Sequence, residues 1–419
     1  MGGSSNDIVY FITVFLQLFA VILGWYYIIV SIFGWIDRKQ NKQMESKDLT
    51  YALVVAAHDE EMVIEYMVQS LQQLNYASDL YDIFVIADNC TDKTARLAHE
   101  AGAQVFERFD TVSRGKGHAL EWMFRKIFVM ERKYDNICVF DADNVVSANF
   151  LTEINKQHNQ GYRVVQGNID SKNPYDTWIS CAYSISFWSI GRLFQRARNN
   201  IGLSCQLSGT GFSVAVDVLK ELGWGATCLT EDMEFTAKLV LNNEKVGWAH
   251  DALVFDEKPL TLAQSWKQRK RWMQGHADVA SRFCVKLFQK GFRDKDMSAL
   301  DCAVYLLQPI KAIAMGIITI MAWVQTAVPD GDFGFFQVGY LFANPLIWWA
   351  LVFFEFIYIP ITVCYERKYL NFKLLIGYLT YGLYSLTWIP ITMQAMFGKN
   401  NKEWYHTKHI RAIDISEME

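Results

Sequence analysis

Hydrophobic and polar positions divide the chain into apolar ends and a mixed middle. Residues 8–36 contain no charged side chain, and a helix needs about 20 such residues to cross a bilayer. Three more uncharged runs lie near the other end, at 312–328, 335–354 and 374–397. The pattern predicts an N-terminal anchor over residues 1–37 and membrane segments over residues 298–397.

The cations between these runs predict an orientation. Arg38, Lys39, Lys42 and Lys47 follow the first run, and the positive-inside rule then places the middle of the chain in the cytoplasm. The last run is broken at residues 388–390 by a proline, and a basic tail over residues 398–419 follows it. We expect a plasma-membrane protein with two full C-terminal spans and a kinked or re-entrant third, which returns the tail to the cytoplasmic face. A full third crossing, with an exposed tail, is the alternative.

Residues 48–257 alternate between two periodicities. Short apolar runs typical of strands lie at 49–57, 82–87, 103–106 and 137–140. Helical patterns follow the first three, and they end near residues 74, 101 and 130. Strands that alternate with helices predict an α/β domain with a largely parallel sheet.

Carboxylates stand where these strands end. The first strand leads to Asp59 and Glu60, the second to Asp88, and the fourth to Asp141 and Asp143. Each acid alone is explained by capping of the next helix. Together they indicate a polar ligand or a metal, because ligands bind beyond the carboxyl ends of parallel strands. Two acids one residue apart suit Mg²⁺ or Mn²⁺.

Two further motifs carry charge at predicted helix starts. Lys116 lies in Arg-Gly-Lys-Gly, where a phosphate would meet backbone N–H groups, although the spacing is not that of a Walker A loop. In Thr230-Glu231-Asp232, the threonine is a predicted N-cap and the helix dipole favours ionised acids. Asp232 is therefore a candidate general base, or an ordinary first-turn acid.

Composition removes some classes of protein. The formal net charge is −4, which argues against a nucleic-acid partner. The 8 cysteines form no CxxC pair, so a zinc site or disulfide framework is not indicated. Residues 175–200 and 261–292 mix aromatic residues with cations. These stretches predict amphipathic helices at a bilayer surface, or helices that pack inside the protein.

The motifs follow a recognisable order after one anchor: Asp88, Asp141-Ala142-Asp143, Thr230-Glu231-Asp232 and Gln268-Arg269-Lys270-Arg271-Trp272. Over almost its whole length the chain resembles the membrane-embedded, processive family 2 glycosyltransferases, which include cellulose, chitin and hyaluronan synthases. The resemblance implies a GT-A-type, Rossmann-like catalytic domain over residues 48–257 and an interface helix over residues 258–297.

The resemblance also implies an activity. It implies an inverting β-glycosyltransferase that polymerises a sugar from a UDP-sugar, with UDP-glucose preferred, and passes the polymer across the membrane. UDP-N-acetylglucosamine as donor, or a single addition to a lipid carrier, are the alternatives. A transporter or scaffold would not explain acids gathered at strand ends.

Roles for single residues come from the same resemblance. It implies nucleotide contacts for Asp59, Glu60 and Asp88, and donor contacts for Lys116 and Asp141. It implies that Asp143 binds a metal and that Asp232, beside Glu231, is catalytic. It also implies that Gln268, Arg271 and Trp272 contact the diphosphate and the acceptor. Residues 208–210 resemble the loop near the acceptor terminus. The sequences Ala57-His58-Asp59-Glu60 and Asp88-Asn89-Cys90 depart from the usual motifs, so base recognition stays open. On a helix, Arg269 and Lys270 are expected to point away from the other three, towards anionic headgroups.

Overall fold

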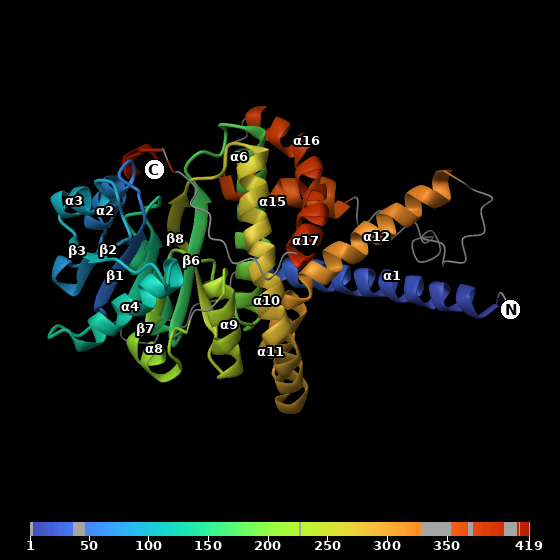
Figure 1. The fold of residues 1–419 in the computed structure, drawn as a ribbon, viewed down its shortest axis with the longest axis horizontal. Helices are drawn as coiled ribbons and strands as arrows, with labels where there is room; N and C mark the ends of the chain where they lie inside the picture. Colours follow the sequence, from blue (N-terminus) through green and yellow to red (C-terminus); the bar gives the residue numbers. More distant parts are fainter. Residues whose placement is uncertain are drawn as a thin grey trace.

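The computed structural model describes residues 3–36, 47–225, 228–327, 353–367, 372–397, 409 and 411–418 (Figure 1). The predicted span 335–354 falls almost wholly outside the described residues, as do most of the basic tail and the cations at 38, 39 and 42. Those predictions remain predictions.

An eight-stranded sheet forms the middle of the chain, in the order β3-β2-β1-β4-β7-β6-β8-β5. The strands are β1 (Tyr51–Ala57), β2 (Tyr81–Asp88), β3 (Gln104–Arg108), β4 (Asn136–Asp141), β5 (Val145–Val146), β6 (Val164–Ser171), β7 (Phe212–Ala215) and β8 (Val246–Asp256). The first four pair in parallel. Beyond β4 the sheet is mixed, because β7 runs antiparallel to both neighbours and β5 antiparallel to β8. The α/β prediction is confirmed, and "largely parallel" holds for the first half only.

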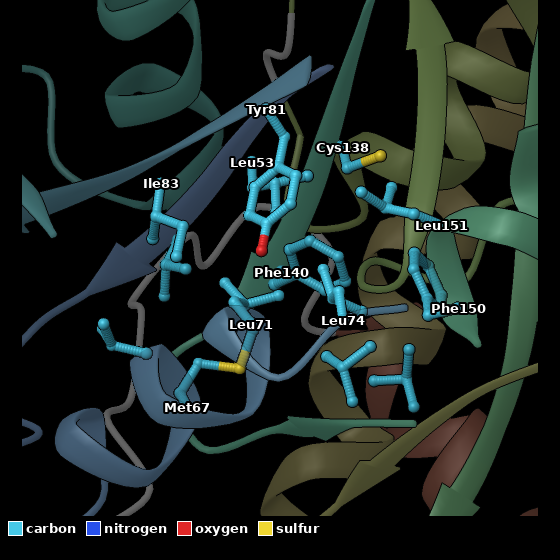
Figure 2. Packing of buried hydrophobic residues seen from close by; sticks show 14 of the residues in the cluster. Leu53, Met67, Leu71, Leu74, Tyr81, Ile83, Cys138, Phe140, Phe150 and Leu151 are labelled. Carbon is cyan, nitrogen blue, oxygen red and sulfur yellow. The ribbon is translucent and has the colours of Figure 1, made fainter. Parts of the chain in front are cut away.

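Helices cover both faces of this sheet. One face carries α2 (Ile64–Gln72), α3 (Thr94–Glu100) and α5 (Phe150–Asn159), and the other carries α4 (Lys116–Val129), α8 (Val216–Leu222) and α9 (Glu231–Leu241). Alternate residues of β1 face the two layers: Leu53 packs with Met67 and Leu71, as Figure 2 shows, whereas Val54 belongs to the layer of α4. A strand buried on both faces reads as a continuous apolar run, which is why β1 was predictable.

The remaining helices lie outside the two layers that cover the sheet. They are α1 (Gly3–Ile32), α6 (Trp178–Ser189), α7 (Ala197–Asn200), α10 (Leu262–Asp294), α11 (Met297–Leu306), α12 (Gln308–Ala327), α15 (Ile359–Arg367), α16 (Phe372–Leu386) and α17 (Trp388–Phe397), with π-helical turns η3 (Ile190–Arg196) and η4 (Phe354–Tyr358) and short 3-10 turns η1 (Phe33–Trp35), η2 (Ser78–Leu80) and η5 (Ile415–Glu417). Two described helical stretches, Ile8–Trp35 and Phe372–Phe397, are long and apolar enough to cross a membrane, and a third is possible if α11 and α12, bent by 48°, count as one span. Helices α1 and α12 extend away from the sheet domain, and α6 and α10 run across their direction (Figure 1).

Both predicted amphipathic stretches are helical, but the first buries two of its arginines, Arg192 and Arg198. Arg192 is buried and pairs with Glu366 of α15. Arg198 is fully buried and donates from Nε to Asp301 of α11 at 2.8 Å. A buried guanidinium needs such a partner, so the expected bilayer-surface helix is here a helix that packs inside the protein.

The end of the chain returns to the sheet domain. Ile415 is buried in one cluster with Val145 and Phe255, and the backbone N–H of Arg411 donates to Glu257 Oε2 at 3.0 Å. The C-terminus accordingly lies beside the sheet, far from the N-terminus (Figure 1). The described tail therefore packs on the sheet domain, and the kinked or re-entrant segment remains a prediction. Helices α16 and α17 meet at Thr387, one residue before the predicted break.

Candidate active site

The ends of β1, β2 and β4 lie together at one edge of the sheet, as predicted. Ala56 pairs with Asp141, and Ala57 pairs with Ala87. Just beyond, the ring nitrogen Nδ1 of His58 lies 2.7 Å from the backbone oxygen of Asp88. The acids that follow these strands therefore face one region.

Lys116 lies at the centre of this region, at the start of α4. Its Nζ donates to Asp141 Oδ1 at 2.5 Å and to the backbone oxygen of Gly209 at 2.8 Å. Burial tends to lower the pKa of Lys116, but Asp141 and Glu231 outweigh it and raise the pKa above its usual value. Lys116 is therefore a permanent positive charge among the acids.

The loop over residues 208–210 lies next to both the Asp-Ala-Asp motif and the candidate base, Asp232. Gly209 has φ +82°, and a Cβ there would lie 3.5 Å from Asp232 Oδ2. Thr210 Oγ1 accepts from the backbone N–H of Asp141 at 3.0 Å and donates to Asn144 Oδ1. The loop predicted to lie near the acceptor thus adjoins both Asp141 and Asp232.

Asp232 lies in the first turn of α9, after Glu231, but it does not behave as an acid stabilised by the helix dipole. Burial and the neighbouring Glu231 raise its pKa to about 7. Thr230 occupies the N-cap position, yet its side chain makes no capping hydrogen bond. The expectation of a readily ionised Asp232 was therefore wrong. A carboxylate with a pKa near neutrality is suited to proton transfer.

The Gln-Arg-Lys-Arg-Trp motif lies on α10, which packs directly on the start of α9. A Cβ on Gly275 would overlap the side chain of Thr230, so only glycine permits this approach. Arg271 lies close enough to Glu231 to lower the pKa of that acid, which burial raises. Gln268 Oε1 and Arg271 Nε are buried and meet no hydrogen-bond partner among the described residues. Buried polar atoms of this kind usually have a partner, which indicates a ligand.

Arg269 does not point towards a headgroup layer. It is fully buried, with its guanidinium 4.3 Å from the ring centre of Tyr384 and 5.0 Å from that of Trp388. Trp272 packs in the same cluster, with its ring 6.0 Å from that of Tyr183. Residues three apart share a helix face, so Arg269 belongs with Trp272 and the predicted division of faces was wrong for Arg269.

Asp143 is joined by a residue that the motifs did not reveal. His409, from the tail, has Nε2 3.6 Å from Asp143 Oδ2 and Nδ1 2.9 Å from Glu60 Oε1. Burial opposes its protonation, but Asp143 and Glu60 raise its pKa to about 10. No local pattern marks His409, because its neighbours come from the far end of the chain. If a cation displaced the proton from Nε2, the neutral imidazole of His409 and the carboxylate of Asp143 could hold it together.

The acids at the ends of β1 and β2, Asp59 and Asp88, already have partners within the protein. Arg108 Nη1 donates to Asp88 Oδ1 at 2.5 Å in a buried ion pair. Asp59, Cys90 and Asp92 have ligand atoms within 4.8 Å of one another. However, Asp59 accepts from the backbone N–H of Thr91 at 2.6 Å, so hydrogen bonding within the turn explains this cluster without a metal.

Comparison with known proteins identifies the family and the fold. A family model described as "Glycosyltransferase like family 2" matches residues 48–275. The chain belongs to glycosyltransferase family 2. Among solved structures, the mannosyltransferase PcManGT from Pyrobaculum calidifontis has a TM-score of 0.56 at 14% identity, over 87% of this chain and 98% of that one. The GT-A-type fold expected for this family 2 glycosyltransferase is thereby confirmed.

Of three curated relatives of this family 2 glycosyltransferase, two have names that state different products. The probable glycosyltransferase YdaM of Bacillus subtilis is 25% identical, over 85% of this chain and 86% of that protein. Poly-beta-1,6-N-acetyl-D-glucosamine synthase of Staphylococcus aureus is 25% identical, over 64% and 66%. Beta-monoglucosyldiacylglycerol synthase of Synechocystis is 29% identical, over 53% of this chain and 47% of that protein. The family is confirmed, and the processive subgroup stays a prediction.

Proposed function

We propose that this protein is an inverting glycosyltransferase that transfers glucose from UDP-glucose to a growing polysaccharide at the membrane, and passes the polymer between its C-terminal helices. One observation carries the proposal: Lys116, which pairs with Asp141, and Arg271 of the Gln268–Trp272 motif both interact electrostatically with the acidic start of α9, where Glu231 and Asp232 lie. The proposed base therefore adjoins cations suited to a diphosphate, and the motif that carries Arg271 also supplies Trp272, an aromatic residue suited to a sugar.

In this proposal Asp232 takes the proton of the acceptor hydroxyl as the new bond to the anomeric carbon forms. The bond between that carbon and the diphosphate oxygen breaks, and its electron pair leaves with the diphosphate. Attack and departure occur on opposite faces, so an α-linked donor gives a β-linked product. A pKa of about 7 lets Asp232 accept a proton near neutral pH.

Lys116 and Arg271 are proposed to bind the diphosphate. Both are cations near the carboxylates of the site, and Arg271 Nε is buried without a partner among the described residues. Positive charge fixed before the reaction stabilises the charge that develops on a leaving group. In this proposal the diphosphate supplies the acceptor oxygen that Arg271 Nε lacks, and a hydroxyl of the bound substrates supplies the donor that Gln268 Oε1 lacks.

A divalent cation fits the neighbouring residues. Asp143 Oδ2 and His409 Nε2 lie 3.6 Å apart, and oxygen with imidazole ligands suits Mn²⁺, with Mg²⁺ as the alternative. PcManGT, which shares the fold, is described in complex with GDP-Man and Mn²⁺. When bound, such a cation would neutralise charge on the diphosphate. In this proposal Asp143 and His409 hold it.

The acceptor is proposed to lie against Trp272, whose ring packs with Tyr183 of α6. A relative named as a polysaccharide synthase supports a sugar polymer. A relative named as a glucosyldiacylglycerol synthase favours the second candidate, glucose transfer to a membrane lipid. Supplying both acceptor types with UDP-glucose and UDP-N-acetylglucosamine, followed by product digestion with linkage-specific hydrolases, distinguishes them.

The variant Asp232→Asn tests the proposed base. It keeps the shape of the side chain and removes its ability to take a proton, so turnover should fall at least about 100-fold. UDP binding, measured by calorimetry, should stay close to wild type. Asp251→Asn, an exposed acid of β8, is the matched control and should leave turnover unchanged. Near-normal turnover of Asp232→Asn would refute the mechanism.

A further inference from the structure

The end of β8 places another acid, Asp256, beside the site. Strands β5 and β8 pair antiparallel, with Val145 opposite Phe255. Continued by one residue, this register brings Asp256 opposite Asn144, next to Asp143 in the chain. Burial and Asp143 together raise the pKa of Asp256 to about 6, against the opposing effect of Lys258, in agreement with this placement.

Lys258 holds Asp256 in place. Its Nζ forms an ion pair with Asp256 Oδ1 and lies 3.3 Å from the ring centre of Phe187. Asn173 fixes the backbone of Lys258 through two hydrogen bonds, of 2.8 Å from the lysine N–H and 2.9 Å to its carbonyl oxygen. The carboxylate is therefore held in one orientation by groups from two other segments.

The second oxygen of Asp256 is left for a ligand. Oδ1 is buried against Lys258, yet the Asp256 side chain is 22% exposed while that of Lys258 is only 2% exposed. The exposure belongs to the rest of the side chain, so Oδ2 is the oxygen that a ligand can reach. An ionised carboxylate only accepts hydrogen bonds, and sugar hydroxyls are suitable donors.

The position of Asp256 indicates which part of the substrates it meets. On one side lies the Asp-Ala-Asp turn. On the other lies α6, because Ser171, the β6 partner of Asp256, is bonded to Ser184 of α6 at 2.8 Å. The group between the diphosphate and an acceptor on α6 and α10 is the transferred sugar. We propose that Asp256 Oδ2 accepts hydrogen bonds from hydroxyls of that sugar and so helps select the donor. This inference rests on the proposed function.

Calorimetry on the full-length protein in detergent with Mn²⁺ tests it, using UDP, UDP-glucose and UDP-N-acetylglucosamine. A hydrogen bond to a charged group is worth enough to predict that Asp256→Asn weakens binding of the preferred UDP-sugar about 10- to 100-fold. UDP affinity should change less than about twofold, because UDP does not reach Asp256. Glu257→Gln loses the same charge one residue further on, where Oε2 meets the N–H of Arg411. It should leave the ratio of UDP-sugar to UDP affinity unchanged.

The possible failures are distinct. Equal weakening of UDP and UDP-sugar by Asp256→Asn, or no change in either, would overturn the role of Asp256 and leave the proposed function intact. A wild-type protein that binds none of the three nucleotides would overturn both. If Asp256→Asn does not fold, Asp256→Glu keeps the charge and moves the oxygens. A changed preference between the two UDP-sugars would then support the inference, and an unchanged preference would overturn it.

Discussion

Asp232 takes its character from its neighbours more than from its place at a helix start. Burial and Glu231 raise its pKa to about 7, so a large fraction is protonated at neutral pH. Only the deprotonated form can accept a proton. At saturating Mn²⁺, kcat/KM should therefore rise with pH, reach a plateau above about pH 7, and fall about tenfold per unit below it.

Glu231→Gln tests the cause of this raised pKa. Removing one negative charge makes ionisation of Asp232 easier, so the midpoint of the pH profile should move to lower pH, with Lys116 and Arg271 unchanged. Glu121→Gln, on the outer part of α4, is the control and should keep the wild-type midpoint. A midpoint that does not move in Glu231→Gln would mean that the group observed is not Asp232.

At the level of single residues, the sequence predicted the acids and cations but not all of their relations. Asp141, Asp232 and Arg271 were identified because each belongs to a short motif. His409 and Asp256 were missed, because each meets the site through packing between distant segments. Arg269 was assigned to the wrong surroundings, because a five-residue motif does not reveal which helices will cover each side of α10.

Helix α10 is fixed to α16 and α17 through Arg269. Besides its two ring contacts, Arg269 Nη1 donates to Thr387 Oγ1 at 2.8 Å. Arg269→Ala should open a cavity between these helices and cost about 2–4 kcal/mol, seen as a lower thermal unfolding midpoint in detergent. Lys270→Ala removes the same charge from a partly exposed neighbour and should leave the midpoint nearly unchanged. Equal midpoints for both variants would contradict a structural role for Arg269.

The approach of α10 to α9 depends on Gly275. In Gly275→Ala the new Cβ would overlap Thr230, and forced overpacking costs about 1–3 kcal/mol. Because Arg271 would move away from Glu231 and Asp232, we expect turnover to fall at least about tenfold. Gly382→Ala is the matched control, since a Cβ there meets nothing within 4 Å. If Gly275→Ala keeps wild-type turnover and stability, the contact does not position the motif.

The elements differed in how well the sequence predicted them. Strands β1, β2 and β4 lie in the parallel part of the sheet and are mostly buried, so their apolar runs stand out. Strands β5 and β7 have only 2 and 4 residues, too few to show a period. The 11 residues of β8 mix polar and apolar positions around a register shift opposite Gly167 and Asn168. The second half of the sheet was therefore not predicted.

For the whole molecule, the tail provides the test of topology. Ile415 packs between Val145 and Phe255 of the sheet domain, and His409 reaches Glu60 and Asp143. A tail on the far side of a membrane could make neither contact. The positive-inside rule predicts that both parts lie in the cytoplasm. An impermeant thiol reagent should therefore not label Ser416→Cys in intact cells and should label it after permeabilisation.

Thr111→Cys, in an exposed turn of the sheet domain, is the reference for this experiment, and the unmutated chain corrects for its 8 native cysteines. Both introduced thiols should become reactive at the same step, because the contacts of Ile415 require one compartment for the two segments. Labelling of the Ser416→Cys variant from outside, while the Thr111→Cys variant stays protected, would show a full third crossing by Phe372–Phe397. His409 could then not reach Asp143, and the metal site would need another ligand.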